Sequence, residues 1–196
     1  PVRGKNIFRT VFFMPNLIGG IILGYIWQLL LNGVLAHWGK TLTYSGTYGL
    51  MGMIILVCWQ QIGYMMIIYI SGIQNIPGEL IEAAKIDGAN SRQVLRKVII
   101  PMVMPSITIC TFLTLTNGFK LFDQNLALNN GQPYIFQSDG SIIHSTEMLA
   151  LNIYNSFYLN ANSRGVGQAK AVLFFILVAA IGLIQLRYTR KKEVQQ

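Results

Sequence analysis

The sequence predicts an all-α, polytopic membrane helix bundle: four transmembrane helices with a charged helix-turn-helix loop between the second and the third. Three observations lead to this prediction, namely an apolar composition, four long apolar stretches, and one long charged segment between two of them. Of the 196 residues, 53% are apolar and only 11% are charged, whereas soluble domains have roughly 25% charged residues. The mean hydropathy of +0.47 agrees with this assignment. We expect a single transmembrane domain over 1–196.

The four predicted crossings cover about 11–31, 49–71, 106–128 and 168–187. Each has about 20 residues, and a helix of that length spans the roughly 30 Å of a bilayer's hydrocarbon core. Pro15 is expected to kink the first crossing. Gly20 and Gly24 form a small-xxx-small pair that would let another helix approach closely, although such pairs are common without that role.

The second crossing carries Gln60 and Gln61 near its middle. Two adjacent amides are costly to expose to lipid, so at least one should face the bundle interior or a water-filled path. A purely structural role as interhelical hydrogen-bonding groups is the alternative. Both residues are therefore candidates for a substrate path.

The third crossing is unusually polar towards its second end. Four polar residues recur there at three- and four-residue spacing and would share one helix face: Asn117, Lys120, Asp123 and Gln124. Lys120 and Asp123 would pair at i, i+3. This face is predicted to line a polar path or to hold an internal ion pair, and the alternative is that these side chains extend to the membrane interface.

The charged segment 76–105 predicts two short helices separated by a glycine. Apolar residues in its first half have helical spacing, and Gly88 supplies the left-handed residue that commonly ends a helix. Asn90 or Ser91 is suited to cap a second helix. We expect that helix to be interrupted by the two prolines that follow, Pro101 and Pro105.

One set of residues in this segment has a specific spacing: Glu82, Ala83, Ala84, Gly88, Val98, Ile100 and Pro101, flanked by Asp87, Ala89 and Pro105. It resembles the EAA loop of the membrane subunits of binding-protein-dependent ABC importers, which reads EAA, three residues, G, nine residues, I, x, L, P. Val98 replaces the usual Ile and Ile100 the usual Leu. A match at seven spaced positions is specific, whereas the tripeptide EAA alone would mean nothing.

The resemblance implies that the loop is a coupling helix that docks on a cytoplasmic ATPase subunit. The residues assigned to this coupling role are Glu82, Ala83, Ala84, Asp87, Gly88, Ala89, Leu95 and Pro101. The simpler alternative is a basic cytoplasmic loop with no partner.

Basic residues are concentrated at both ends and in the central loop: Arg3, Lys5, Arg9, Lys85, Arg92, Arg96, Lys97, Arg187, Arg190, Lys191 and Lys192. The other two connections hold Lys40 and Arg164, with Lys120 and Lys170 near span ends. This distribution predicts that both ends and the central loop are cytoplasmic. The net charge of +8 is spread over separate loops, which favours membrane lipids as partners and not nucleic acid.

Further residues resemble the carbohydrate permeases of this importer family, of the maltose and glycerol-phosphate types. They are Phe8, Arg9, Thr10, Phe12, Phe13 and Pro15, then Phe122, Asp123, Gln124, Asn130, Gly131, Pro133, Ser145, Thr146, Glu147 and Tyr154. The family's GGP is altered to Asn130, Gly131, Gln132, Pro133, and an insertion precedes Thr146. Family members usually have six crossings, so the chain is expected to be a C-terminal portion that lacks the first two.

The resemblance implies a permease subunit of an ATP-driven sugar importer in a bacterial or archaeal inner membrane, working by alternating access. Its expected partners are ABC ATPase subunits, a second permease subunit and an extracytoplasmic sugar-binding protein. Since no G-x-x-x-x-G-K-[ST] string occurs, ATP hydrolysis is expected in another subunit, and this chain is not expected to be an enzyme. The alternatives are an ABC permease for a non-sugar solute and an ion-coupled secondary transporter.

No cofactor or metal is expected. His37 and His144 are isolated in the sequence, and Cys58 and Cys110 lie inside apolar stretches, which is typical of buried small apolar residues.

Overall fold

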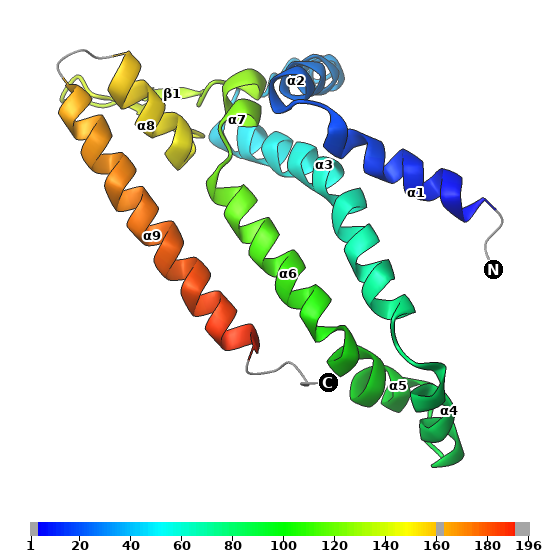
Figure 1. The fold of residues 1–196 in the computed structure, drawn as a ribbon. Coiled ribbons are helices and arrows are strands. Elements are labelled where there is room, and N and C mark those ends of the chain that lie inside the picture. Colours follow the sequence, from blue (N-terminus) through cyan, green and yellow to red (C-terminus); the bar gives the residue numbers. More distant parts are fainter. Residues whose placement is uncertain (1–3, 160–162, 191–196) are drawn as a thin grey trace.

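The structure is a computed structural model that describes residues 4–159 and 163–190. It is a helical bundle in which one two-stranded hairpin is the only sheet of the described residues (Figure 1). The elements are α1 (Lys5–Phe13), the 3₁₀ turn η1 (Met14–Leu17), α2 (Gly20–Ala36), α3 (Gly46–Gln74), α4 (Gly78–Ile86), α5 (Ser91–Val94), the π-helical segment η2 (Leu95–Ile99), α6 (Ile100–Phe119), α7 (Asp123–Leu128), β1 (Tyr134–Phe136), β2 (Ile142–His144), α8 (Leu149–Tyr158) and α9 (Arg164–Arg190).

The long helices converge on a layer formed by α2, α7, the hairpin and α8, at the top of Figure 1, which we call the upper layer. α1 and α6 run towards this layer, α3 and α9 run away from it, and α4 and α5 lie at the opposite end (Figure 1). Three helices are long and apolar enough to cross a membrane: α3, the continuous helix Ser91–Phe119, and α9 over Arg164–Thr189. The pair α1–α2 adds a fourth if it is one bent span. The predicted class, a polytopic membrane helix bundle, is confirmed.

The first predicted crossing, 11–31, is not one helix. It is broken at Ile18 and Gly19, which are both extended, with ψ angles of 130° and 140°, and the helices on either side are bent by 103°. Pro15 lies in the 3₁₀ turn before the break, where its missing N–H and fixed φ weaken the helix. The kink expected at Pro15 is therefore a complete change of direction a few residues later.

The third predicted crossing, 106–128, also differs from expectation, because its helix ends at Phe119. Lys120 leaves the helical region, and the short helix α7 starts afresh at Asp123. Asn117 and Gly118 in the last turn are weak helix formers, and the break lets α7 turn across to pack on α2. The helix therefore begins earlier and ends earlier than the apolar pattern indicates.

The prediction that Pro101 and Pro105 interrupt the second loop helix is wrong. The helix is continuous from Ser91 to Phe119. Its hydrogen-bond pattern changes in η2, where the N–H of Ile100 bonds to the carbonyl of Leu95. A π-helical turn shifts the hydrogen-bond register by one residue. That shift accommodates Pro101, which has no N–H to donate, within the first turn of α6.

The upper layer is held by close packing of α2 on α7. A Cβ added at Gly20 would lie 2.8 Å from Cβ of Asp123, and one added at Gly24 would lie 2.6 Å from Cβ of Ala127. Gly20 and Gly24 therefore let another helix, α7, approach closely, as their small-xxx-small spacing indicated. Beside it, five buried residues from α2, α3, α7 and the α2–α3 connection form the apolar core: Leu23, Leu42, Met53, Leu56 and Leu128.

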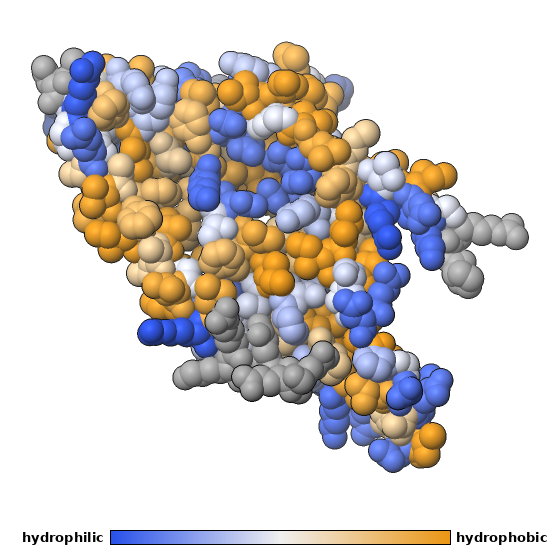
Figure 2. All heavy atoms as spheres, viewed as in Figure 1, coloured by the Kyte–Doolittle hydropathy of each residue, from blue (hydrophilic) through white to orange (hydrophobic). Residues whose placement is uncertain are grey.

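Most of the remaining apolar surface is uncovered, as expected for membrane helices (Figure 2). In the most apolar 18-residue windows of α3, of Ser91–Phe119 and of α9, only 22%, 17% and 6% of the residues are buried. Of the basic residues that set the predicted orientation, Arg3, Lys191 and Lys192 lie outside the described residues.

Gly63 should be the least replaceable glycine of the bundle. A Cβ at this position of α3 would overlap the carbonyl oxygen of Phe12 in α1, so Gly63→Ala should lower the stability of the full-length protein in detergent by about 1–3 kcal/mol. Thermal unfolding followed by size-exclusion chromatography would measure the loss. The matched control is Gly33→Ala in α2, where nothing lies within 4 Å of the added Cβ; an equal loss in both variants would contradict the packing argument.

Candidate functional site

Two regions at opposite ends of the Ser91–Phe119 helix hold the polar residues that the sequence singled out. One is a polar cavity where α3, α6 and α7 meet beneath the upper layer. The other is the exposed pair α4–α5 at the far end of the molecule (Figure 1). Figure 2 shows hydrophilic residues gathered at the first region and surrounded by apolar surface.

The polar cavity has a volume of about 390 Å³. Its lining residues are Asn16, Gln61, Asn117, Lys120, Leu121, Phe122, Asp123 and Gln124. Five of the six residues predicted to line a substrate path therefore share one cavity, although they come from two predicted crossings. The sixth, Gln60, is not in the lining but is bonded to Gln124, which is.

Hydrogen bonds between amides join the two sides of the cavity. Gln124 Nε2 donates to Gln60 Oε1 at 3.0 Å, and Asn117 Nδ2 donates to Gln61 Oε1 at 3.5 Å, which is a weak bond. Gln60 is 6% exposed and also donates to the carbonyl of Ile18 at 3.4 Å. Gln60 thus has the structural role that the sequence left as an alternative, whereas Gln61 faces the cavity.

The bond from Gln60 to Ile18 shows how the break in the first crossing is stabilised. Ile18 is extended, so its carbonyl is not used by a helix, and an unpaired carbonyl inside an apolar region is costly. The buried amide of Gln60 satisfies it. The break also places Asn16 in the cavity.

Lys120 and Asp123 do not form the predicted pair. The helix ends between them, so they do not share a helix face with Asn117 and Gln124. Among the described residues no carboxylate oxygen lies within the 4.0 Å limit of a salt bridge from the Lys120 ammonium. Both side chains are exposed at the mouth of the cavity.

Three lining residues were not predicted: Asn16, Leu121 and Phe122. Asn16 follows Pro15 in a segment that the apolar pattern assigns to a continuous span, and only the break turns it inwards. Phe122 stands in the FDQ string of the sugar-permease resemblance, which was the available signal. Its ring packs on Tyr154 of α8, with the centroids 5.0 Å apart.

A buried network of polar side chains positions α7 over the cavity. Asn125 Nδ2 donates to Asn129 Oδ1 and to the carbonyl of Thr146, both at 3.0 Å, and Asn129 Nδ2 donates to Thr146 Oγ1 at 2.8 Å. The N–H of Met148, just before α8, donates to Asn125 Oδ1 at 2.8 Å. Because all its polar atoms are matched, this network ties α7 to the segment between the hairpin and α8.

A second network ties α8 to α9. The Glu147 carboxylate accepts hydrogen bonds from the amides of Asn152 and Asn155. Lys170 of α9 donates to Asn152 Oδ1 and to Ser156 Oγ, each at 2.8 Å. Glu147 belongs to the STE string of the resemblance. Because its carboxylate is bonded to two amides of α8, its role in this structure is to support the upper layer.

Most of the predicted coupling residues lie on or between α4 and α5, whereas Leu95 begins η2 and Pro101 lies in the first turn of α6. Glu82, Ala83, Asp87, Gly88 and Leu95 are exposed, whereas Ala84, Ala89 and Pro101 are partly buried. Exposed apolar side chains occur in the same segment: Ile86 is 85% exposed, Leu95 is 47% exposed and Leu80 is 43% exposed. This segment therefore carries both charged and apolar exposed side chains.

The turn between α4 and α5 has the local structure that the sequence predicts. Gly88 has φ of +79°, and nothing lies within 4 Å of a Cβ added there, so glycine is needed for backbone conformation and not for space. Asn90, of the two predicted caps, begins α5 in a capping box with Gln93, with bonds of 3.0 and 2.8 Å.

The fold is similar to that of solved ABC importers. A bacterial transporter that imports the acidic polysaccharide alginate matches with a TM-score of 0.73 over 97% of this chain and 68% of that chain, at 18% identity. The same kind of transporter in complex with a periplasmic protein bound to alginate pentasaccharide matches with a TM-score of 0.71 over 97% of this chain and 67% of that one, at 19% identity.

Curated relatives cover almost the whole chain. A probable starch degradation products transport system permease protein, AmyD of Thermoanaerobacterium thermosulfurigenes, is 44% identical over 99% of this chain. A multiple sugar-binding transport system permease protein, MsmF of Streptococcus mutans, is 32% identical over 98% of it. The chain spans 66% of the length of each.

The family of binding-protein-dependent transport system inner membrane components matches residues 2–193. This match covers the exposed helix pair, the polar cavity and all the long helices. The chain therefore belongs to the binding-protein-dependent transport system inner membrane component family.

Proposed function

We propose that the chain is a membrane-spanning permease subunit of an ATP-driven sugar importer in a prokaryotic inner membrane. The observation that carries the sugar assignment is that the relatives AmyD and MsmF, which match 99% and 98% of the chain, are named for starch degradation products and for multiple sugars. Both ends of the chain and the α4–α5 pair are placed on the cytoplasmic side, and the upper layer on the outer side.

The polar cavity is proposed as part of the sugar path. Its amides, from Asn16, Gln61, Asn117 and Gln124, each offer both donors and an acceptor. Sugar hydroxyls also donate and accept, so such a lining would replace water around a neutral, hydroxyl-rich solute as it leaves the aqueous phase. Phe122 adds an apolar ring for the less polar face of a sugar.

This lining also bears on the two alternative functions. An ion-coupled secondary transporter would need ionisable side chains on its path, for which Lys120 and Asp123 are the candidates, and these two form no salt bridge among the described residues. A non-sugar ABC permease has no specific support from the cavity.

Coupling is proposed to pass through α4 and α5 to the cavity. An ATPase subunit would contact the exposed surface that includes Glu82, Ile86 and Leu95. Because α5, η2 and α6 form one helix of 29 residues, roughly 43 Å long, a displacement of α5 would move Asn117 at the other end. The helix is thus a direct mechanical link between ATPase and path.

The remaining partners are a second permease subunit and an extracytoplasmic sugar-binding protein. Support for the latter is the solved alginate transporter, which was obtained with a periplasmic protein bound. ATP hydrolysis is assigned to the ATPase subunits.

Glu82→Ala should weaken co-purification of the ATPase with the full-length permease by about 5–30-fold in affinity, since it removes one charged contact worth about 1–2 kcal/mol at an interface. Its matched control is Glu79→Ala, another exposed carboxylate in the same helix. Pull-down in detergent with a titrated ATPase measures the effect. Equal binding by both variants would refute a specific role for Glu82.

Gly88→Pro should abolish ATP-driven sugar uptake while leaving the permease inserted, because proline cannot adopt a φ of +79°. The control is Gly78→Ala, at an open position in the first turn of α4. Uptake into proteoliposomes and insertion measured by membrane fractionation separate coupling from folding; unchanged uptake in Gly88→Pro contradicts the proposal.

Asn117→Leu should reduce sugar uptake by about 10-fold or more without loss of ATPase binding. The substitution leaves a sugar hydroxyl and the Gln61 amide without a hydrogen-bond partner, which costs about 1–3 kcal/mol in free energy. The control is Thr111→Val, also on α6, whose hydroxyl bonds only to its own helix at the carbonyl of Ile107. If Asn117→Leu transports as well as Thr111→Val, the cavity is not on the path.

A further inference from the structure

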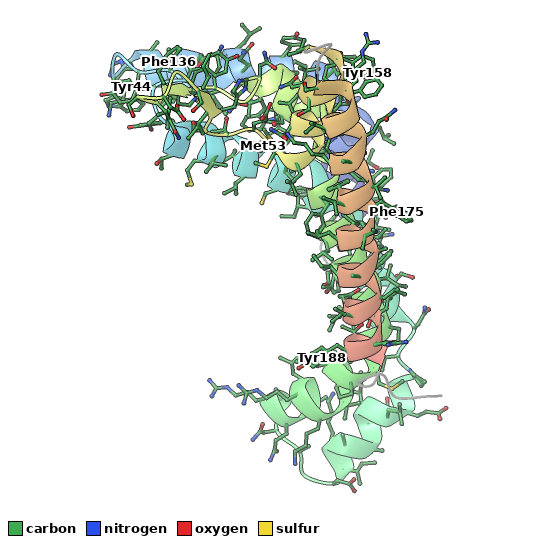
Figure 3. The ribbon with its side chains drawn as sticks, turned by 90° about the vertical axis from the view of Figure 1, so that its left-hand side faces the viewer. Tyr44, Met53, Phe136, Tyr158, Phe175 and Tyr188 are labelled. Atoms are coloured by element: carbon green, nitrogen blue, oxygen red, sulfur yellow. The ribbon has the colours of Figure 1, made fainter. Side chains whose placement is uncertain are left out.

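An apolar groove runs along the outside of the bundle between α6 and α9. Its volume is about 510 Å³, and no described residue fills it. The walls are Phe112 on α6 and Phe174, Phe175, Val178, Leu183 and Leu186 on α9. Figure 3 shows α9 along its length with Phe175 and Tyr188 labelled.

The groove has a single charged group, at one end. Lys120 lines it at the end nearest the upper layer. Thr116 is the other polar lining residue, but its hydroxyl already donates to the carbonyl of Phe112 at 2.8 Å, so it offers a methyl group and no free donor. The ammonium of Lys120 is exposed and, among the described residues, has no salt bridge. An apolar channel with one unpaired cation at its mouth complements a molecule with an apolar tail and an anionic head.

The dimensions favour one hydrocarbon chain. From Phe174 to Leu186, α9 rises by roughly 18 Å, which is a little more than half of a hydrocarbon core of about 30 Å. At Gly182 the two walls of the groove already approach each other, since a Cβ added there would lie 3.4 Å from Phe112 Cε2. A helix is about 10 Å across, whereas an unbranched acyl chain is much thinner and can lie along the seam between α6 and α9 outside this contact.

We propose that this groove binds an anionic phospholipid, with an acyl chain against Phe112, Phe174 and Leu183 and the phosphate at Lys120. The lipid belongs to the leaflet on the side of the upper layer. Lys120 then has an anionic partner at the membrane interface, and the groove is filled by lipid that stays with the protein. Because Lys120 also lines the polar cavity, the bound headgroup would lie beside the cavity mouth.

The test is native mass spectrometry of the full-length transporter from nanodiscs containing equal amounts of phosphatidylglycerol and phosphatidylcholine. Wild type should retain phosphatidylglycerol in preference. Lys120→Gln should lower that preference by about five-fold, the effect of one basic residue near an anionic headgroup. Gly182→Leu should displace the retained lipid of both kinds, because its side chain occupies the groove.

The matched control is Lys40→Gln. Lys40 is a cation on the same side of the protein, in the α2–α3 connection, and it does not line the groove. Its ammonium donates a hydrogen bond of 2.8 Å to the Tyr48 hydroxyl. Gly182→Ala provides a smaller change, since its Cβ would be in ordinary contact with Phe112, and should lower retention without disturbing the fold.

Three outcomes would overturn the proposal: no preference for phosphatidylglycerol in the wild type, equal retention in Lys120→Gln and Lys40→Gln, or unchanged lipid in Gly182→Leu. If that variant keeps its lipid and also loses subunit assembly, a protein helix covers the groove. The measurement needs neither sugar nor ATP, so its failure is distinct from failure of the proposed transport function.

Discussion

The requirement that polar groups be paired inside an apolar bundle organises the half of the molecule that holds the cavity. Gln60 meets this requirement at the critical point, because it bonds both to the carbonyl of Ile18, freed by the break between α1 and α2, and to Gln124 at the start of α7. Without it, the break would leave an unpaired carbonyl in surroundings where that is costly. Three segments far apart in the sequence are joined through this one side chain.

The other features of the cavity depend on that junction. With α2 turned by 103° from α1, Gly20 and Gly24 face α7 and let it approach to van der Waals contact. The network of Asn125, Asn129 and Thr146 then holds α7 from the opposite side. α7 is thus clamped between two sets of contacts, and Asp123 and Gln124 are held at the cavity by backbone position and not by a charge pair.

The two ends of the Ser91–Phe119 helix have different physical character, and the difference suits their proposed roles. At the α4–α5 end, side chains are exposed and the backbone is set by local devices, a left-handed glycine and a capping box, so the surface is formed without a partner. At the cavity end, amides from several elements converge, so a small displacement of any one changes the lining. The π-helical segment at Leu95–Ile99 keeps the connection continuous through Pro101.

The sequence by itself determined the membrane class, the approximate positions of the long helices, and the turn at Gly88 with a cap at Asn90 or Ser91, because apolar composition, helical period and turn chemistry are local properties. Residue types also identified Gln61, Asn117 and Gln124 as polar residues in need of partners. Only the tertiary structure decided where the first and third predicted crossings break, that Asn16 joins the cavity, and that Lys120 and Asp123 remain apart. Those outcomes depend on α7 packing against α2 and on the Gln60 bonds, which are contacts between segments more than 40 residues apart; no local pattern encodes which of several feasible partners a buried amide or a glycine face will meet.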